Sequence, residues 1–553
     1  MLLASFALAD NRKISADLKK APPGDLVTVI VQFHDTPDNH TLKAIGVKGG
    51  QTKKLLKNFK GGMFSVAASA VPAIAALPAV KYISVDRAVR PQVDLTGPTT
   101  GAYVAQQYGL TGRGVGIAVL DSGVYTSHSD LRVTGSYNSR VVYSESFIGS
   151  GSGDQYGHGT HVAGIIAGNG AASMNKYRGM APEANIVSLR VLDQNGVGSD
   201  SAVVTAVDRA IELKSVYNIR VMNLSLGRPV MESYALDPLC QAVEKAWKAG
   251  IVVVVSAGNN GRDNSVGNQG YGTITSPAND PYVITVGAMK SMGTPWRTDD
   301  RMASYSSKGP TVGDHFVKPD ILAPGNKVAS LRSPGSFLDS AYPSNRISPT
   351  SYGVWSYTAV YTRMSGTSMA APAVSGTAAL MLQWQPSLTP DQVKARLMKT
   401  ASKSFPSVTI ATDPITLKTY TTYYDIFTVG AGYLNTSAAL ANAELVSGRA
   451  LSPKAAYDPV TRKVTVTASA IAWGEAIAWG ESVAWGQSVV WGPSVLAIAW
   501  GEAIAWGEAI AWGEAIAWGE STTAGFNSIW NSSVAWGETT TAAQHAIAIE
   551  GEE

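Results

Sequence analysis

The chain has 553 residues, of which 45% are hydrophobic and 15% charged, and it contains 55 glycines. This composition excludes a disordered or collagen-like protein and is typical of a globular chain of about two to four domains. The net charge is only +3, but the residues from Ile471 onward contain ten Glu and no Lys or Arg, so a basic body precedes an acidic tail. No basic cluster with interleaved aromatic residues occurs, which argues against nucleic-acid binding.

The sequence contains one cysteine, Cys240, so an internal disulfide is excluded. No motif typical of a catalytic cysteine surrounds it, and we expect it to be buried and inert. Stability then has to come from packing or from bound ions.

The first nine residues, Met1 to Ala9, are apolar and end in Ala-Leu-Ala, which is typical of the end of a secretory signal peptide. They lack a basic start, so we expect either a truncated signal peptide or a start codon assigned too late, and a frayed N-terminus stays open as the alternative. No run reaches the roughly 18 apolar residues of a membrane helix, and no transmembrane segment is expected. A signal peptide predicts a secreted or cell-surface protein.

Residues 26–90 alternate strand and helix signals, and this pattern predicts a small α+β unit that ends at the polar connector 91–100. The expected order is strand, helix, strand, helix, strand, over residues 27–33, 42–60, 63–68, 72–80 and 81–89.

From about Gly114 onward, short runs of β-branched residues alternate with helical stretches. The runs are residues 115–120, 186–191, 221–224, 251–255 and 283–286. Such continuous apolar runs are typical of parallel strands covered on both faces, so we predict an α/β domain over residues 99–446. Its last helix is expected over residues 389–401, where Thr389 and Gln392 can form a capping box.

A linker is expected over residues 447–463, followed by a repeat tail over residues 464–553. The repeat is Ala-Ile-Ala-Trp-Gly-Glu, with Trp at positions 473, 479, 485, 491, 500, 506, 512, 518 and 536. A period of six scatters the Trp residues around a helix but keeps them on one face of a strand. The spacing of nine between Trp491 and Trp500 swaps the faces and indicates a bend. We predict a β-solenoid or a stack of short strands, and a disordered low-complexity tail stays open as the alternative.

Amide cleavage needs a nucleophile, a base, a group that orients the base and a donor for the oxyanion. The α/β domain offers a candidate for each role in Ser368, His158, Asp121 and Asn259. Asp121 and Asn259 follow buried strands, at the ends where α/β sites form. The other two lie in the runs Gly-His-Gly-Thr-His-Val-Ala-Gly at 157–164 and Gly-Thr-Ser-Met-Ala-Ala-Pro at 366–372.

These four segments, in this order, resemble the subtilase family over roughly residues 110–440. The resemblance implies a subtilisin-like three-layer domain with a mostly parallel central sheet, and a serine endopeptidase that acts through an acyl-enzyme. In this family pattern Ser368 attacks the peptide, His158 accepts and returns the proton, and Asp121 orients the imidazole. Asn259 and the Ser368 backbone NH donate to the oxyanion. An Asn at this position argues against the sedolisin branch, which has Asp.

The resemblance also assigns the substrate-binding residues. Ser225, Leu226 and Gly227 resemble the edge along which a peptide adds as a strand, while Ala257 and Gly258 resemble a wall of the primary pocket. Protein and peptide substrates of broad sequence are implied. Arg228 follows where many members have glycine, so we expect a reshaped or more basic pocket.

The chemistry implied by the family needs no cofactor. Subtilases often bind calcium after the histidine helix, but residues 169–176 contain no carboxylate and include Lys176. The metal ligands stay unknown, and a structural calcium bound by carbonyl groups and Asn stays open.

Other polar residues near the motifs are expected to have structural roles. We expect His161 to pack in the interior and His128 to lie at the surface. Ser122 and Thr367 are expected to bond within their own turns. Asp154 is expected to be a solvated loop residue rather than an electrostatic modifier of the catalytic histidine.

The unit at residues 26–90 resembles the β-α-β-β-α-β prodomain of subtilisins, which implies an intramolecular inhibitor and a self-processing zymogen cut between Asp86 and Thr100. Two other classes stay open. One is an inactive peptide-binding module with the same fold. The other is a chiefly structural protein whose tail self-associates or binds a cell surface.

Overall fold

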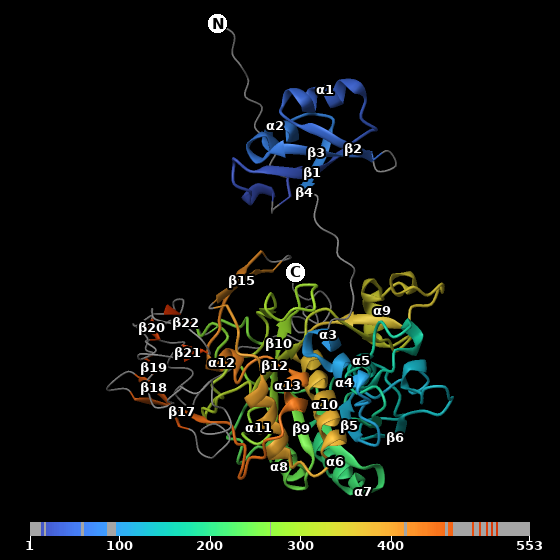
Figure 1. Cartoon of the computed structure of the whole chain (residues 1–553), viewed down its shortest axis with the longest axis vertical. Helices are drawn as coiled ribbons and strands as arrows, with labels where there is room; N and C mark the ends of the chain where they lie inside the picture. The colour runs from blue at the N-terminus through green and yellow to red at the C-terminus, as the bar shows by residue number, and fades with distance from the viewer. Residues whose placement is uncertain are drawn as a thin grey trace. The chain divides into compact units, whose positions relative to one another are not determined.

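A computed structural model describes residues 13–15, 18–56, 60–85, 96–265, 267–406, 408–413, 417–458 and 463–467, and five two-residue strands between residues 489 and 517. The chain divides into two compact units, Met1–Pro91 and Gln92–Glu553 (Figure 1). The expected signal peptide at Met1–Ala9 lies outside the described residues. Among the residues described, no helix is long and apolar enough to cross a membrane.

The first unit is a four-stranded antiparallel sheet with two helices, in the order β-α-β-β-α-β. The elements are β1 (Leu26–Phe33), α1 (Asn39–Val47), β2 (Gln51–Leu56), β3 (Gly61–Ala67), α2 (Val71–Ala75) and β4 (Val80–Val85), and the strand order is β2-β3-β1-β4. Alternate residues of β1, namely Val29, Val31 and Phe33, point into a core that also contains Phe64 and Ile83. The unit therefore has a hydrophobic core of its own.

The helix expected over residues 42–60 is only partly right. Asp38 caps α1 by accepting a 2.8 Å hydrogen bond from the Thr41 NH, and the helix ends at Val47. Residues 51–56 form the edge strand β2 instead, because they pair with β3, a contact that local polarity does not reveal.

The second unit contains an eight-stranded sheet whose strands are almost all parallel. Its strands are β5 (Gly116–Asp121), β6 (Val141–Ser146), β7 (Asn185–Arg190), β8 (Ile219–Leu224), β9 (Val252–Ser256), β10 (Ile284–Lys290), β11 (Arg301–Met302) and β12 (Ile321–Pro324). The order is β11-β10-β9-β8-β5-β7-β6, with β12 pairing with β10, and only the β10–β11 pair is antiparallel. The five predicted strand runs all fall on these strands, which confirms a mostly parallel α/β sheet.

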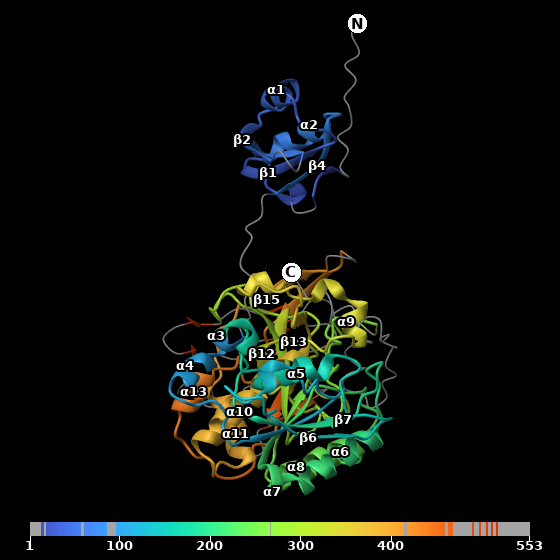
Figure 2. The same cartoon turned by 90° about the vertical axis from the view of Figure 1, so that its right-hand side faces the viewer.

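Helices cover both faces of this sheet. Helix α10 (Thr367–Trp384) packs on β8, β9 and β10 beside α5 (His158–Ala167), while α6 (Asp200–Glu212) and α8 (Pro238–Lys248) pack together on the other face (Figure 2). The result is a three-layer arrangement.

The other α-helices and strands of this unit up to residue 441 are all shorter than α10. They are α3 (Thr96–Thr100), α4 (Ala102–Gln107), α7 (Lys214–Tyr217), β13 (Val328–Leu331), α9 (Phe337–Ala341), β14 (Tyr361–Met364), α11 (Pro390–Thr400), β15 (Val408–Thr412), β16 (Thr419–Tyr423), α12 (Ile426–Val429) and α13 (Thr436–Ala441). The capping box predicted at the start of α11 is confirmed, since Thr389 and Gln392 exchange both hydrogen bonds.

Residues 449–453, within the stretch expected to be a linker, are hydrogen-bonded to the α/β domain. The Ala450 NH donates to Asp391 Oδ1 at 2.8 Å, the Ser452 NH donates to the Pro281 carbonyl at 2.9 Å, and the Val317 NH donates to the Pro453 carbonyl at 2.8 Å. The next residues form the hairpin of β17 (Lys454–Asp458) and β18 (Lys463–Thr467). This stretch therefore packs along the domain rather than standing away from it.

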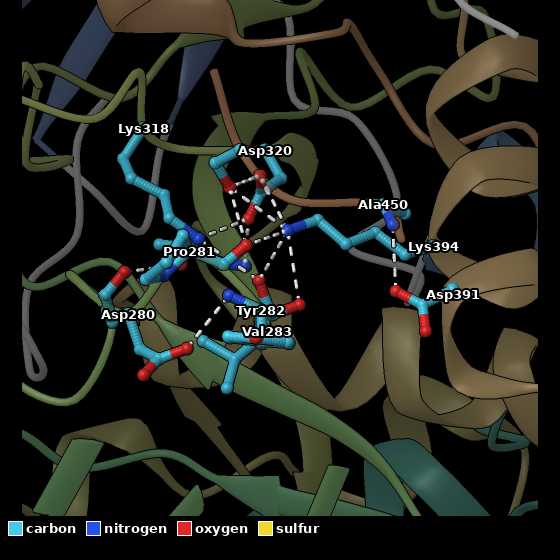
Figure 3. A network of polar contacts seen from close by, with 12 residues as sticks. Asp280, Pro281, Tyr282, Val283, Lys318, Asp320, Asp391, Lys394 and Ala450 are labelled. Carbon is cyan, nitrogen blue, oxygen red and sulfur yellow. Dashed lines mark hydrogen bonds and ion pairs between the residues drawn. The ribbon is translucent and has the colours of Figure 1, made fainter. Parts of the chain in front are cut away.

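Ser452 completes a fully buried cluster of charges, of which Lys318, Asp320 and Lys394 are labelled in Figure 3. Its Oγ donates to Asp320 Oδ1 at 2.5 Å and accepts from Lys394 Nζ at 3.0 Å. Lys394 also donates to the Pro281 carbonyl at 2.8 Å, and Lys318 Nζ donates to Asp320 Oδ2 at 2.7 Å. Buried charges are tolerated only when they are paired and hydrogen-bonded, and Ser452 supplies part of that pairing.

Beyond Thr467 the structure describes β19 (Val489–Val490), β20 (Ala497–Ile498), β21 (Ala505–Trp506), β22 (Ile510–Ala511) and β23 (Ile516–Ala517). Their pairing is antiparallel: β19 with β18, β20 with β23, and β21 with β22. Apart from Trp506, the repeat Trp residues lie outside the described residues, so the solenoid and the low-complexity tail stay predictions.

Candidate active site

Asp121 and His158 meet at the carboxyl end of β5. Asp121 is the last residue of that strand and is fully buried, while His158 is the first residue of α5. His158 Nδ1 lies 2.8 Å from Asp121 Oδ1, which also accepts the Ser122 NH at 2.7 Å. A carboxylate at Nδ1 fixes the tautomer in which Nε2 is the acceptor.

The glycine after the histidine allows this approach. A Cβ at Gly159 would lie 2.2 Å from the Gly123 carbonyl oxygen and 3.2 Å from Asp121 Oδ1. Any side chain at residue 159 would therefore push the first turn of α5 away from the end of β5.

Asp154 holds the start of α5, and the prediction that it is a solvated loop residue is wrong. The carboxylate is buried and accepts hydrogen bonds from the Gly157 NH at 2.6 Å, the Thr160 NH at 2.8 Å and the Ser122 hydroxyl at 2.8 Å. The Ser122 hydroxyl accepts from the Gly159 NH at 2.9 Å, so it joins β5 to α5 rather than bonding within its own turn. An acidic residue four positions before the helix was the sequence signal, because the first NH groups of a helix need acceptors.

The two histidines of α5 have opposite electrostatic environments. Burial lowers the pKa of His158, but the charge and hydrogen bond of Asp121, with a further contribution from Asp154, raise it above the ordinary value. Burial and the neighbouring His158 lower the pKa of His161 to about 3, and its Nε2 lies 3.1 Å from the Val328 carbonyl oxygen. His161 is therefore a neutral packing residue.

Ser368 is the second residue of α10 and lies against the end of β8. Its Oγ donates to the Ser225 carbonyl at 3.2 Å, and the Ser225 hydroxyl donates back to the Ser368 carbonyl at 2.8 Å. Ser368 Oγ and His158, both among the described residues, are not hydrogen-bonded to each other. Bonds between nucleophile and base often tighten only when substrate is bound.

Asn259 and the Ser368 NH border the same space beside Gly366. Asn259 Oδ1 accepts from the Thr367 NH at 2.9 Å and the Thr367 hydroxyl at 3.1 Å, so its amide nitrogen remains as a donor. A Cβ at Gly366 would lie 3.2 Å from Asn259 Nδ2 and 3.7 Å from the Ser368 nitrogen. Gly366 also has φ of +144°, where side chains are strained. Thr367 thus positions Asn259, contrary to the expectation that it bonds only within its own turn.

Thr275 lies between the expected binding edge and the expected pocket wall. No sequence motif had indicated a role for this residue. A Cβ at Gly227 would lie 2.6 Å from Thr275 Oγ1, and one at Gly258 would lie 2.9 Å from Thr275 Cγ2. Thr275 Oγ1 also donates to the Ala257 carbonyl at 3.3 Å. The two glycines therefore accommodate one threonine side chain between them.

Residues 112–427 match the model of the subtilase family. The chain belongs to the subtilase family. Among its relatives, the serine protease AprX of Bacillus subtilis (strain 168) is 40% identical over 337 residues, which cover 59% of this chain and 70% of AprX. Subtilisin DY of Bacillus licheniformis is 35% identical, with 55% of this chain and 90% of that protein covered. Subtilisin E of Bacillus subtilis (strain 168) is 33% identical, with 65% and 80% covered. This subtilase is a serine endopeptidase.

Arg228 of this subtilase is surrounded by acids. Its guanidinium lies 2.9 Å from Asp200, 3.0 Å from Asp237 and 3.7 Å from Glu232. Its backbone exchanges hydrogen bonds of 3.0 and 2.8 Å with Ser276. The positive charge expected to make the pocket more basic is thus balanced locally by carboxylates.

The carboxylate nearest the loop at residues 169–176 is already hydrogen-bonded, so a calcium ion bound there by carbonyl groups and Asn stays a prediction. This carboxylate, Asp130, accepts the Ala172 NH at 2.8 Å and the Tyr361 hydroxyl at 2.5 Å. Lys176 Nζ donates to the Ser351 carbonyl at 2.6 Å, which adds a positive charge to the loop. Across the described part of the chain, no three His, Cys, Asp or Glu side chains are grouped as metal ligands.

His128 and Cys240 are two further residues whose surroundings were predicted from the sequence. His128 is buried, with Nε2 2.9 Å from the Val360 carbonyl oxygen and Nδ1 accepting from the Asp130 NH, so the prediction of a surface histidine is wrong. Cys240 is fully buried on α8, and burial raises the pKa of its thiol, which makes it unreactive as predicted.

Proposed function

We propose that this subtilase is a secreted, self-processing endopeptidase in which Asp121, His158 and Ser368 form the catalytic triad. The observation that carries the proposal is the 2.8 Å contact between His158 Nδ1 and the buried Asp121 carboxylate, at the sheet edge where strand ends and helix starts converge. Ser368 at the start of α10 and the donors beside Gly366 support the same assignment.

In the proposed mechanism Ser368 Oγ attacks the scissile carbonyl carbon while His158 Nε2 takes the hydroxyl proton. The negative charge that forms on the carbonyl oxygen is stabilised by Asn259 Nδ2 and the Ser368 NH. His158 then gives its proton to the departing amine and leaves an acyl-enzyme. A water attacks the ester by the same route in reverse and releases the acid and the free serine. Asp121 keeps the ring oriented throughout and stabilises the imidazolium.

Substrates are proposed to lie as an extended strand along Ser225, Leu226 and Gly227, with Ala257 and Gly258 forming a wall of the primary pocket. Backbone pairing of this kind accepts many sequences. Because Thr275 fills the space between the two glycines, we expect its side chain to limit how deep the pocket is.

The N-terminal unit is proposed to be an inhibitory prodomain, removed by a cut between Asp86 and Thr100. Its β-α-β-β-α-β order and its own hydrophobic core support this role. The tail beyond residue 463 is proposed to self-associate or to attach the enzyme to a cell surface, and the apolar residues Met1–Ala9 support export.

Labelling with a fluorophosphonate, which reacts only with activated serines, tests the triad. The intact chain should be labelled at Ser368, should digest casein and should trim its own N-terminal unit. A Ser368→Ala variant should do none of these, while Ser215→Ala, which changes an exposed serine on α7, should behave as the wild type. The triad assignment fails if the wild type carries no label on Ser368, and self-processing fails if the Ser368→Ala chain is trimmed equally.

A further inference from the structure

We propose that Phe337 and Tyr156 form an apolar subsite beside His158, which selects an aromatic or large aliphatic side chain within three residues of the scissile bond. This inference rests on the proposed role of His158 as the base. It adds a specificity element from a part of the chain that none of the catalytic motifs includes.

The subsite comes from a long excursion between two paired strands. Strands β13 and β14 are antiparallel neighbours, with Leu331 opposite Tyr361, so residues 332–360 leave the pair and return to it. Helix α9 lies in this excursion. A tight turn would have sufficed to connect the strands, so most of these residues serve another purpose.

The excursion is hydrogen-bonded to the segment that leads into the catalytic helix. The Phe337 NH donates to the Gln155 carbonyl at 2.9 Å, and the Leu338 NH donates to the Tyr156 carbonyl at 3.0 Å. The Ser333 hydroxyl donates to the Asp154 carbonyl at 2.9 Å. Three consecutive carbonyl groups before the Gly157–His158 step are thus bound by one segment.

Aromatic rings extend from this contact to the histidine. The Phe337 ring is stacked on Tyr156, with centroids 5.9 Å apart and planes 14° from parallel, and the Tyr156 centroid is 6.4 Å from that of His158. A Cβ at Gly196 would lie 2.6 Å from the Tyr156 ring, so residue 196 has to be glycine for the ring to lie there. Phe337 remains 42% exposed while Tyr156 is only 8% exposed. An apolar face is thus presented to solvent next to the base.

The tyrosine stays uncharged while the enzyme works. Burial and the nearby Asp121 raise the pKa of Tyr156 to about 12. The Tyr156 ring is therefore uncharged near neutral pH, and the stack is apolar on its Phe337 side. Such a surface binds aromatic and aliphatic side chains better than it binds charged side chains or a glycine.

Ion pairs of Asp339 hold the helix that carries Phe337. Asp339, two residues further along α9, accepts from Arg332 at 2.5 and 2.7 Å, from Arg346 at 2.7 Å and from the Gly335 NH at 2.9 Å. These bonds tie α9 to the first residue of the excursion and to Arg346 beyond the helix. The subsite is thus preorganised, which favours selection between substrates because little ordering is needed on binding.

The test uses peptides that differ at a single position, with Phe, Leu, Gly or Asp placed in turn at each of the three positions on either side of the cut. In the wild type, kcat/KM should favour Phe over Gly by about tenfold or more at one of these positions, the range typical of an apolar pocket. In Phe337→Ser this ratio should fall to near one. Tyr108→Ala, which removes an exposed aromatic ring on another element, should keep the wild-type ratio.

Labelling of Ser368 by fluorophosphonate is measured for every variant. A labelled Phe337→Ser enzyme with the wild-type Phe-to-Gly ratio would overturn the subsite alone, whereas an unlabelled wild type would overturn the proposed function and the subsite with it. Should Phe337→Ser not fold, Phe337→Leu replaces it and should lower the Phe-to-Leu ratio at the same position. An unchanged ratio in Phe337→Leu would overturn the subsite.

Discussion

Asp121 sets the pH at which His158 can act. Because the base works only when neutral and Asp121 raises its pKa, the acid limb of kcat/KM should lie above the ordinary histidine value of about 6.5. In Asp121→Asn burial still lowers the pKa of His158 and only the smaller contribution of Asp154 still raises it. The limb should therefore move to lower pH, while kcat should fall by about 10⁴-fold. A pH–rate profile measures both.

The control for this change is Asp208→Asn, which removes a carboxylate paired with Lys245 at the surface. Its profile should match that of the wild type. An Asp121→Asn enzyme with an unmoved acid limb would contradict the electrostatic role given to Asp121.

Gly366 keeps the space for the oxyanion open. In Gly366→Ala the new methyl group would lie 3.2 Å from Asn259 Nδ2, and the backbone would be strained at φ of +144°. We expect kcat to fall by about 10²–10³-fold, as when one oxyanion donor is lost. Gly109→Ala also strains a backbone of positive φ, here +79°, but its methyl group would meet open space, so it should cost stability and leave kcat intact. Equal kcat losses in both variants would mean that backbone strain causes the loss in Gly366→Ala, and not the methyl group beside Asn259.

At the scale of elements, Asp339 links the excursion at residues 332–360 to the stability of the domain. Arg332 and Arg346 outweigh the effect of burial and lower the pKa of Asp339 to about 2. A lowered carboxyl pKa contributes stability that is complete above the unfolded value of about 3.9 and is lost as the pH falls toward 2. The size of the shift corresponds to roughly 2 kcal/mol.

We therefore expect Asp339→Asn to lower the free energy of unfolding by about 2–4 kcal/mol at neutral pH, since it also leaves Arg332 without its carboxylate. Urea unfolding between pH 2.5 and 7 would show the difference from wild type shrinking at the acid end. Glu212→Gln, at an exposed ion pair with Arg209, should change stability by less than about 0.5 kcal/mol. A difference that does not depend on pH would exclude this explanation.

The sequence predicts elements well where their signal is local. The parallel strands are buried on both faces, so runs such as 251–255 are continuously apolar and stand out, and the cap at Thr389 lies within four residues. Strand β2 was mistaken for helix because its identity depends on pairing with β3.

In the candidate site, too, residues with a local sequence signal could be predicted, and residues that depend on distant partners could not. The residues of the motifs at 121, 158, 259 and 368 could be placed from the family pattern, and the structure puts Asp121 beside His158. The burial of Asp154 and His128 was missed because it depends on partners distant in sequence. Nothing in the periodicity of residues 332–360 indicates that Phe337 lies against Tyr156.

At the scale of the whole molecule, residues 449–453 close the core of the catalytic unit. A chain ending after residue 446 would lose the Ser452 hydroxyl from the cluster of Lys318, Asp320 and Lys394. We expect it to be less stable by about 1.5–3 kcal/mol, the contribution typical of a hydrogen bond to a charged group, because the ion pairs of Lys318 and Lys394 with Asp320 stay in place. Chemical denaturation in a Ser368→Ala background, where self-cleavage is excluded, measures this.

The matched control ends after residue 467 and retains the hairpin of β17 and β18. It should be as stable as the full chain. If the two truncated chains unfold at the same denaturant concentration, Ser452 is dispensable.

The Ser452 contact also imposes an order in time. Asp320 and Ser452 are 132 residues apart, so at about 5–20 residues per second a ribosome needs on the order of ten seconds between them. The N-terminal unit ends at Pro91 and has a core of its own, so it can fold well before that interval begins. Under the proposed function, the inhibitory prodomain can therefore fold before Ser452 completes the buried charge cluster of the catalytic domain. During synthesis, the catalytic domain then obtains its complete core only when its inhibitor is already folded.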